Sequence, residues 1–455
     1  MKVMKKNLII IILMSGLISF QTSKKVEDIV VIGGGLMGSS SAWQLSKYNQ
    51  NVLLIEQQDS IYTFGSSLGE ARISRSLGPI KDIFSFLQQT SVSETKDLID
   101  YLNKGELEKS HSMENIYKTS PVTYIYYNNQ LNQVENLLDG QRDRFQYASS
   151  PEQAEEKFAM KISDSTLIIR EFKEYSGTLN PKVLIDKLHK GIIKKRNRIF
   201  YNKKVTGLYQ ENGIYVIKII DTKTGVSEKI FSKKVISAAG PYNGTLLKDI
   251  APYFSNLITP KRLFLSFLKI NPNKYDSLTF EQKNKLKVAY PVANFNSEIF
   301  YSMIEKYDDK DRPLLKVGGH YLRTDIEDLN SVWEIELSEQ EIKWSKENSL
   351  KYLNKLRLPI EFSDLKYSGG YSCVYSLTSS EIPYVTEILK RNNEIDSNFV
   401  IIGGMSGIGA KGSLAYGLIA ADLILGNINN SFMYKKAKLA LGSERLIKDL
   451  QNIEN

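Results

Sequence analysis

The sequence predicts an α/β protein in which a doubly wound, Rossmann-like domain with an inserted β-meander is joined to an antiparallel-sheet α+β domain. Three observations predict this fold. A strand, a glycine loop, a helix and a second strand follow one another over residues 28–56, and another buried strand runs into glycines over residues 399–413. Between these units, residues 205–231 have the pattern of three short strands, the first two joined at Asn212-Gly213, a strong hairpin signal. From residue 261 to residue 367 the pattern changes to further antiparallel strands.

The unit at residues 28–56 has the spacing of a dinucleotide site. Gly33, Gly35 and Gly38 form a G-x-G-x-x-G between a β-branched strand and a helix, and Glu56 ends the second strand. The first glycine allows the tight turn, the second lets the backbone approach a pyrophosphate, and the third lets helix and strand pack closely. The pyrophosphate would bind the free N–H groups at the positive end of the helix, and Glu56 would accept hydrogen bonds from ribose hydroxyls.

A glycine-rich turn alone is a weak signal, and an ordinary βαβ corner is the alternative interpretation. The complete order of strand, glycines, helix, strand and acid within about 30 residues favours the nucleotide. The acid at position 56 favours a free ribose hydroxyl, so FAD or NAD fits better than NADP. The β-meander that interrupts the doubly wound part is typical of FAD-binding rather than NAD-binding versions of the Rossmann-like fold.

The composition is that of an ordinary globular protein of two domains or more. The chain has 455 residues, of which 42% are apolar and 24% charged. The net charge of +9 comes from scattered lysines and leaves no nucleic-acid footprint. His111, His189 and His320 lie far apart and have no metal-ligand spacing, and a single cysteine, Cys373, excludes an intramolecular disulfide.

Residues 1–26 are predicted to be a signal peptide or a membrane-tethering segment. Three lysines within the first six residues precede an apolar run over residues 8–20. A run of about 13 residues is shorter than the 20 or so that span a bilayer, but it suits the apolar region of a signal peptide. Neither a clean cleavage site nor a twin-arginine pair follows. Export, or tethering through residues 4–20, is favoured over an N-terminal extension of a cytoplasmic protein.

The two domains are expected to alternate along the chain. Helices are predicted over residues 82–103, 181–196 and 338–353, the last opened by a capping box. Strands of the substrate-side domain are expected at residues 261–270, 287–292, 298–304 and 314–318. After the leader, the expected segments are FAD-binding (27–110), substrate (111–179), FAD-binding (180–255), substrate (256–366), FAD-binding (367–430) and a C-terminal tail helix (431–455).

Two loops carry basic residues that suit an anionic ligand. A loop rich in glycine and serine ends in Arg72 and Arg75, which would share one face if the segment were helical. Guanidinium groups grip carboxylate or phosphate well, and a solvated face is the alternative. Lys411 precedes a helix of small residues, where its charge and the helix N-terminus could stabilise a reduced flavin. A surface lysine beside a structural turn is the alternative there.

Five segments, residues 28–56, 66–75, 315–320, 373–378 and 403–413, together resemble the monomeric sarcosine oxidase family. This family belongs to the D-amino-acid-oxidase-type flavoproteins and includes the N-methyltryptophan and pipecolate oxidases. The resemblance extends from residue 28 to about residue 426 and implies that the cofactor is FAD. The predicted cofactor contacts are Gly33, Gly35, Gly38, Glu56, Arg72, Val205, Gly240, Cys373, Gly407, Gly409 and Lys411.

The resemblance also implies roles in catalysis. Cys373 matches the cysteine that bonds FAD covalently, and Arg72 matches a basic residue near the flavin. Arg75 and Lys411 match the pair that binds the substrate carboxylate. Lys316 matches the lysine that promotes reaction with O2, where a cation is suitable because negative charge develops on oxygen. The residues that match the lining of the amine site are His320 and Tyr301.

The predicted activity is therefore that of an FAD-dependent oxidase of secondary or N-methyl amino acids, which passes a hydride to the flavin and reduces O2 to hydrogen peroxide. The expected partners are an amine that carries a carboxylate, and O2, and the protein is expected to be a monomer. One alternative is a dehydrogenase of the same fold that uses another electron acceptor. Another is a flavin-binding sensor without turnover, because fold alone does not establish activity.

Overall fold

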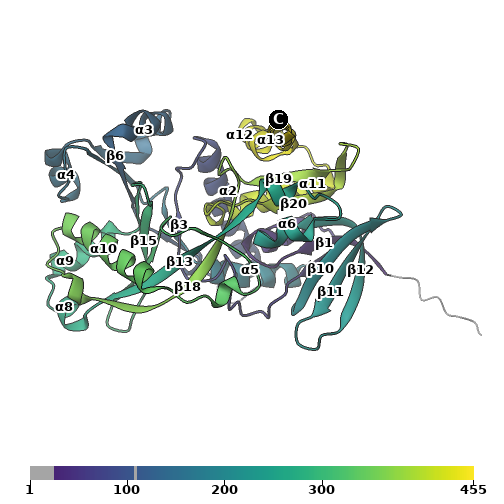
Figure 1. The fold of residues 1–455 in the computed structure, drawn as a ribbon, viewed down its shortest axis with the longest axis horizontal. Helices are drawn as coiled ribbons and strands as arrows, with labels where there is room; N and C mark the ends of the chain where they lie inside the picture. The colour runs from purple at the N-terminus through teal and green to yellow at the C-terminus, as the bar shows by residue number, and fades with distance from the viewer. Residues whose placement is uncertain (1–24, 107–109, 455) are drawn as a thin grey trace, which may run out of the picture.

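The computed structural model describes residues 25–106 and 110–454 (Figure 1). The predicted leader, residues 1–26, lies outside the described residues except for its last two positions. In the part of the chain that is described, no helix combines the length and the apolar content that crossing a membrane requires.

The first sheet has β1 (Val26–Ile32) near its centre. Within the described residues it comprises eight strands, and β1 pairs in parallel with β2 (Val52–Ile55) and with β12 (Ser227–Ser237). The parallel part extends through β9 (Arg198–Phe200) on one side and β20 (Ile395–Gly403) on the other, and β19 (Tyr384–Leu389) adds an antiparallel edge. The parallel strands β1, β2, β9, β12 and β20 come from distant parts of the chain, and their order confirms the predicted doubly wound α/β fold.

The predicted meander is formed by β10 (Lys203–Glu211), β11 (Ile214–Asp221) and the first half of β12. It projects from one end of the molecule (Figure 1). We expected the third strand of the meander to end at residue 231, and this is wrong, because β12 continues to Ser237. Residues 227–232 of β12 pair with β11 and residues 231–237 pair with β1, so the backbone never leaves the sheet.

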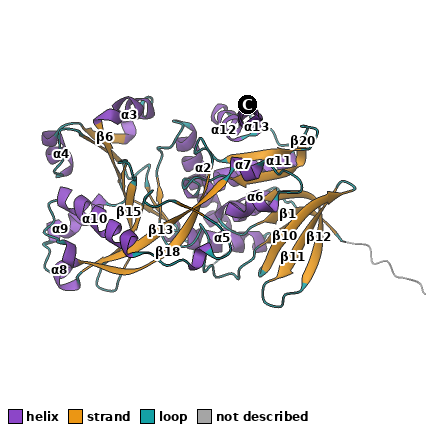
Figure 2. Cartoon of the chain, viewed as in Figure 1, coloured by secondary structure: helices purple, strands orange, loops and turns teal. Residues whose placement is uncertain are grey.

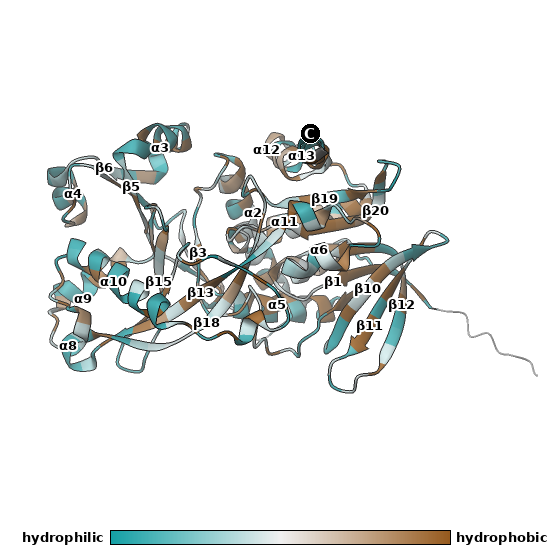
Figure 3. Cartoon of the chain, in the orientation of Figure 1, coloured by the Kyte–Doolittle hydropathy of each residue, from teal (hydrophilic) through white to brown (hydrophobic). Residues whose placement is uncertain are grey.

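Helices cover both faces of this sheet. On one face lie α1 (Leu36–Lys47), α2 (Ile83–Asn103), α5 (Pro181–Lys194) and α11 (Ser413–Leu425), whose apolar side chains form one core with Ile29 and Val31. On the other face, α7 (Phe254–Leu257) and α13 (Ser443–Glu454) pack with Val30 and Ile32, and α6 (Asn243–Leu246) precedes α7. Alternate residues of β1 therefore enter two cores, as expected for a strand buried on both faces. The second half of β20, residues 399–402, is hydrophobic and buried (Figure 3).

The second sheet is mostly antiparallel. Its strand order among the described residues is β17-β13-β16-β15-β14-β5-β7-β6, with β18 also paired to β13. The strands are β5 (Val122–Tyr127), β6 (Phe145–Ala148), β7 (Thr166–Glu171), β13 (Thr259–Ile270), β14 (Val292–Asn294), β15 (Phe300–Tyr307), β16 (Pro313–Gly318), β17 (Thr324–Asp325) and β18 (Leu365–Leu377). A three-stranded sheet consists of β3 (Arg72–Ser74), β4 (Tyr117–Thr119) and β8 (Gly177–Leu179).

The helices of this half lie at the end of the molecule away from the meander (Figure 2). They are α3 (Leu131–Leu138), α4 (Pro151–Phe158), α8 (Pro272–Asp276), α9 (Phe280–Ala289) and α10 (Glu339–Lys355). The capping box predicted for α10 is present, with Ser338 and Glu341 bonded to each other's backbone. Helix α10 is largely hydrophilic in Figure 3, and its buried face combines Trp344, Tyr352 and Leu353 with polar side chains.

Two further predictions of local structure are wrong. Residues 287–292 were expected to be a strand, but α9 continues to Ala289, because Thr279 and Gln282 form a capping box that starts a helix at residue 280. The loop that carries Arg72 ends in the strand β3, which pairs with β8. In place of one tail helix, residues 431–455 contain α12 (Phe432–Leu441) and α13, separated at Gly442.

Candidate active site

A cavity of about 660 Å³ lies between the two large sheets, lined by the glycine loop before α1, by β10, β15, β16 and β18, and by residues 405–411. This volume falls within the roughly 300–1,000 Å³ of ligand pockets. Of the predicted site residues, all described, only Gly38 does not line it. Those that do are Gly33, Gly35, Glu56, Arg72, Arg75, Val205, Gly240, Tyr301, Lys316, His320, Cys373, Gly407, Gly409 and Lys411.

The glycine loop is packed too tightly for side chains at two of its positions. Gly33 has φ +94°, and a Cβ there would lie 2.5 Å from the carbonyl oxygen of Ala238. A Cβ on Gly38 would lie 1.8 Å from the carbonyl oxygen of Gly33. Gly38 is therefore behind the loop, in the contact between helix and strand that the sequence predicted for it. Gly35 is the N-cap of α1, and it leaves the first turn of the helix open to the cavity.

Glu56 faces the cavity at the end of β2. Its Oε2 accepts the Gly34 N–H at 2.6 Å and its Oε1 accepts the Gln58 N–H at 2.8 Å. Burial raises the pKa of this carboxyl, and the two backbone donors oppose the change. Each carboxylate oxygen has a second lone pair for a hydroxyl donor. An open helix N-terminus and a buried acid on one cavity wall fit the pyrophosphate and ribose of a dinucleotide.

Arg72 is fixed at the opposite end of the cavity by the loop that precedes it. Its guanidinium donates to the carbonyl oxygens of Ser66, Leu68 and Ala71. Cys373, on β18, is buried against Leu263 and Leu265 and lines the cavity. Burial raises the pKa of this thiol, and the nearby Arg72 and Lys316 oppose the change.

Lys316, on β16, is fully buried, and its ammonium group forms an ion pair with Glu305. Its Nζ lies 2.5 Å from Glu305 Oε2 and 3.1 Å from the carbonyl oxygen of Ala71. Burial and the charge of Arg72 lower the pKa of Lys316 to about 7, and Glu305 opposes the decrease. The ammonium is thus close to the balance between its charged and neutral forms at neutral pH.

Arg75 and Lys411 meet at one carbonyl. Arg75 Nη1 donates to the Leu77 oxygen at 2.7 Å, and Lys411 Nζ donates to the same oxygen at 2.5 Å. Burial, and then the charge of Arg75, lower the pKa of Lys411 well below the ordinary lysine value. Lys411 is buried and Arg75 is half-buried, and the two cations share one neutral acceptor. The nearby carboxylate whose charge acts on Lys411 is Glu171. A second anion would further stabilise this pair of cations.

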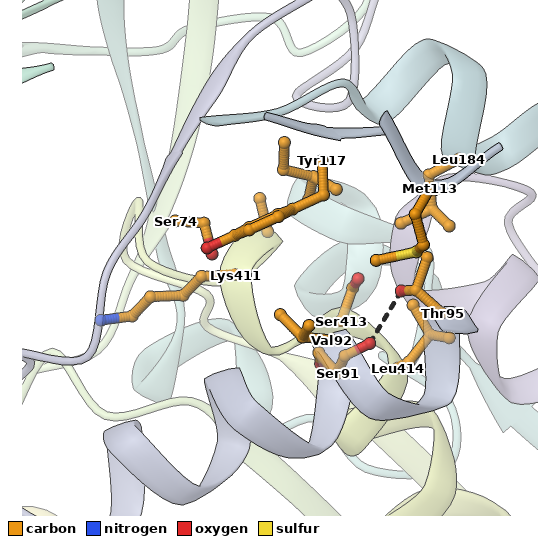
Figure 4. Close-up of a pocket in the computed structure, with 12 residues that line it drawn as sticks. Ser74, Ser91, Val92, Thr95, Met113, Tyr117, Leu184, Lys411, Ser413 and Leu414 are labelled. Carbon is orange, nitrogen blue, oxygen red and sulfur yellow. Dashed lines mark hydrogen bonds between the residues drawn. The ribbon is translucent and has the colours of Figure 1, made fainter. Parts of the chain in front are cut away.

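A second, much smaller cavity lies beside the stem of Lys411 (Figure 4). It is lined by Ser74, Ser91, Thr95, Tyr117 and Ser413, among others. Its volume of about 10 Å³ holds about one water molecule. Figure 4 shows the Lys411 nitrogen directed away from this group of side chains. Because this second cavity holds only about one water molecule, it cannot be a substrate site.

The wall opposite the two cations is aromatic. The Tyr301 hydroxyl lies 3.1 Å from that of Tyr375, and the His320 ring stands at 90° to the Tyr375 ring with 6.4 Å between centroids. Burial, with the charge of Arg323, lowers the pKa of His320 to about 3, so its imidazole is neutral at physiological pH. Burial raises the pKa of Tyr301 well above its ordinary value, so its phenol stays protonated.

The sequence did not reveal two buried carboxylates near these cations. Glu305 pairs with Lys316, and Glu171 accepts hydrogen bonds from the Tyr124 hydroxyl at 2.5 Å and from the Ser76 N–H at 3.1 Å. Burial raises the pKa of Glu171, and this increase is opposed by hydrogen bonds from Ser76 and Tyr124 and by the charge of Lys411. One sequence signal could have revealed them, because each acid ends a largely apolar run with the pattern of a strand. The run at residues 300–304 precedes Glu305, and the run at residues 166–169 precedes Arg170-Glu171.

The fold and the site together define a flavoprotein oxidoreductase, and the comparisons support this class. Residues 28–423 match the family described as DAO, FAD dependent oxidoreductase. The chain therefore belongs to this FAD-dependent family, and the predicted resemblance is confirmed.

Three curated relatives are similar over most of the chain. A protein named probable sarcosine oxidase from Arabidopsis thaliana is 25% identical over 88% of this chain and 88% of its own. A glycerol 3-phosphate oxidase from Mycoplasma genitalium is 23% identical over 87% of this chain and 94% of its own. An N-methyl-L-tryptophan oxidase from Yersinia pestis is 24% identical over 87% of this chain and 94% of its own.

Among solved structures, the open form of NikD, an unusual amino acid oxidase essential for nikkomycin biosynthesis, has the same fold. It is similar with a TM-score of 0.65 and 16% identity, over 91% of this chain and 98% of that one.

Proposed function

We propose that the protein is an FAD-dependent oxidase of secondary or N-methyl amino acids. The observation that carries this proposal is the pair Arg75 and Lys411, two cations that share the Leu77 carbonyl in the wall of the cavity. Such a pair suits the carboxylate of an amino acid. The names of the sarcosine and N-methyltryptophan oxidases among the relatives support the same class of substrate.

The carboxylate clamp places the rest of the substrate against the aromatic wall. Arg75 lies beside two rings that contact each other: its guanidinium carbon is 5.7 Å from the centroid of Tyr124 and 5.8 Å from that of Phe295. A carboxylate bound there offsets the effect of burial on Lys411, because a nearby negative charge favours the protonated form of the lysine. The amine then lies beside neutral His320 and the hydroxyls of Tyr301 and Tyr375, which orient it without adding charge.

In the overall reaction, O2 takes up the electrons and protons that the substrate loses. The substrate CH–NH group loses two electrons and two protons to become an imine, water hydrolyses the imine, and O2 takes up two electrons and two protons to give hydrogen peroxide. Bound FAD supplies the hydride acceptor and the oxygen-reactive ring. The chain binds and orients the amine, and it places the Lys316 charge where negative charge develops on oxygen.

Covalent attachment of FAD to Cys373 is part of the proposal. The thiol lines the same cavity as Arg72 and Lys316. Burial raises the pKa of this thiol, and the charges of Arg72 and Lys316 oppose the increase, which favours the nucleophilic thiolate. We expect acid-precipitated wild-type protein to stay yellow, and Cys373→Ser to release the colour into the supernatant. Because the chain has no other cysteine, retention of the colour by Cys373→Ser would exclude a thioether link.

The decisive experiment is a substrate screen on the purified holoenzyme. N-methyl and cyclic amino acids, their decarboxylated amines and glycerol 3-phosphate are mixed with it without oxygen, and bleaching of the flavin is recorded. We expect bleaching by amines that carry a carboxylate, and peroxide formation when air is admitted. Bleaching by glycerol 3-phosphate alone would contradict the proposal. Bleaching by amino acids without peroxide, but with turnover of an artificial acceptor, would identify a dehydrogenase instead.

A further inference from the structure

The pairing of Lys316 depends on an irregularity in β15. Lys316 lies in the middle of three strands, opposite Phe267 of β13 and Met303 of β15. The register between β15 and β16 shifts between Ile304 and Lys306, so Glu305 is the extra residue of a β-bulge. Bulges redirect a side chain next to active sites at the cost of regular pairing.

The bulge brings a carboxylate into a buried position where both of its oxygens are used. Glu305 Oε2 accepts from Lys316 Nζ at 2.5 Å, and Oε1 accepts from the Glu70 N–H at 2.6 Å. Lys316 in turn donates to the carbonyl oxygen of Ala71. The pair is thus held between the second sheet and residues 69–71, which come from the FAD-binding half. A Cβ on Gly69 would lie 2.7 Å from Lys316 Nζ, so this loop closes directly over the ammonium.

We propose that Glu305 is a positioning residue for Lys316, and that its carboxylate keeps the ammonium charged and fixed beside the cofactor cavity. Glu305 therefore governs the reaction with oxygen and leaves the oxidation of the amine unaffected. The inference rests on the proposed oxidase function, in which Lys316 acts on oxygen.

The charges around Lys316 show why a carboxylate is needed. The groups that face it are Arg72 of β3, Glu305 of β15, and Tyr371 and Cys373 of β18. Arg72 is a fixed cation, so it favours the neutral amine, as does burial. Glu305 opposes both effects. Without it the pKa of Lys316 falls below about 7, and the amine loses its proton within the physiological range.

The test uses the holoenzyme with four variants: Glu305→Gln, which keeps the shape, Lys316→Met, the double variant, and Lys306→Gln. Lys306 is the exposed neighbour at the same bulge and serves as the control. Flavin reduction by substrate and reoxidation by O2 are measured separately between pH 6 and pH 9. The visible spectrum of the resting flavin is titrated over the same range as a readout that needs no turnover.

Reoxidation slows as pH rises, and we expect Glu305→Gln to lower the midpoint of this decrease by at least one pH unit. Above the midpoint, the rate of reoxidation should then be about tenfold lower than in the wild type. Flavin reduction should change less than about twofold, and the double variant should reoxidise as Lys316→Met does, because Glu305 acts through the lysine. The spectral titration should disappear in Lys316→Met, shift downward in Glu305→Gln and stay in place in Lys306→Gln.

An unchanged spectral titration in Glu305→Gln overturns the inference, as does a double variant whose loss is the sum of the two single losses. The proposed function fails in a different way. If no amine reduces the flavin, or if the reduced wild-type flavin does not react with O2, the oxidase chemistry is wrong, whatever the titration shows. If Lys316→Met reoxidises at the wild-type rate, Lys316 does not act on oxygen, and the inference about Glu305 is overturned while the oxidase function stands.

Discussion

At the scale of single residues, the site is a small set of buried charges in which each group has few partners. Lys411 and Arg75 share the Leu77 carbonyl, while Lys316 has Glu305 and the Ala71 carbonyl. For the first pair, which has two cations, the carboxylate whose charge acts on Lys411 is Glu171, whereas Lys316 is in direct contact with Glu305. We infer that an anionic ligand binds at the first pair and that the second has no unmet need for one.

The clamp leads to a prediction about ligand affinity. Lys411→Met should weaken binding of the substrate carboxylate by about 1.5–3 kcal/mol, the range for hydrogen bonds to charged groups. That loss corresponds to a roughly 10- to 150-fold increase in KM, with a smaller change in kcat. Lys355→Met serves as the control, since Lys355 is a half-buried lysine that does not line the cavity. Equal kinetic losses in the two variants would contradict the clamp.

The same lysine predicts a pH dependence. The pKa of Lys411 is lowered in the folded protein, and only its protonated form attracts a carboxylate, so affinity should fall as pH rises through this lowered pKa, below the usual 10.4 or so. Propionate, which has a carboxylate but no amine, isolates this effect. Its dissociation constant can be measured from the change in the flavin spectrum. Affinity that is constant with pH, or a pH dependence that persists in Lys411→Met, would show that Lys411 does not bind the carboxylate.

The sequence indicated the basic residues of the site but not their acidic partners. Arg72, Arg75, Lys316 and Lys411 belong to motifs of consecutive residues, which a family resemblance preserves. Glu305 depends instead on a bulge, whose register is set by pairing between two strands. Local sequence carries little information on such pairing.

At the scale of elements, close packing of small residues holds the nucleotide-binding half together. A Cβ on Gly38 would meet the Gly33 oxygen at 1.8 Å, and one on Gly417 of α11 would meet the backbone carbon of Ser40 of α1 at 2.6 Å. In both cases the obstacle is backbone, which cannot move aside cheaply. Helix α1 can therefore approach the loop after β1 only because Gly38 has no side chain, and it can approach α11 only because Gly417 has none.

This packing predicts the effect of adding one methyl group. Gly38→Ala and Gly417→Ala should each destabilise the protein by about 1–3 kcal/mol or more, the cost of overfilling a packed site, and Gly38→Ala should also lose FAD. Gly207→Ala is the matched control, because the nearest atom to its Cβ is the flexible Lys218 Cδ at 3.5 Å. Thermal unfolding and flavin content are measured for all three. Equal stability of Gly417→Ala and Gly207→Ala would contradict the account.

Elements were predictable where local signals agreed with tertiary contacts. The helices α2, α5 and α10 begin and end within about two residues of their predicted limits, since caps and apolar periodicity indicate the same boundaries. Residues 287–292 failed because an apolar pattern that resembles a strand lies at the end of a helix whose start, Thr279, is eight residues earlier. Short apolar runs do not distinguish the two structures.

At the scale of the whole molecule, the cavity exists because segments far apart in the chain close on one another. Its cofactor-binding end comes from residues 33–58 and 203–206, and its reactive end from residues 293–320 and 373–411. The pair of Lys316 and Glu305 bonds residues 70–71 to the second sheet and so joins the two halves at this point. The opening motif therefore binds one end of the cofactor, and the chemistry depends on the later segments.

We propose that the predicted leader, residues 1–26, directs export or tethering. The first described strand begins at Val26, which pairs with Phe231, so we expect the chain to keep its fold when residues 2–24 are removed. The shortened chain should be soluble in the cytosolic fraction, with the same flavin content and unfolding temperature as the full chain. The full chain should fractionate with the membrane or outside the cytosol, and N-terminal sequencing shows whether the leader is cleaved. If the full chain stays in the cytosol with an intact N-terminus, the leader is only an extension. In that case the apolar run would need a binding partner other than a lipid bilayer, because 13 consecutive positions rich in leucine and isoleucine are costly to leave in water.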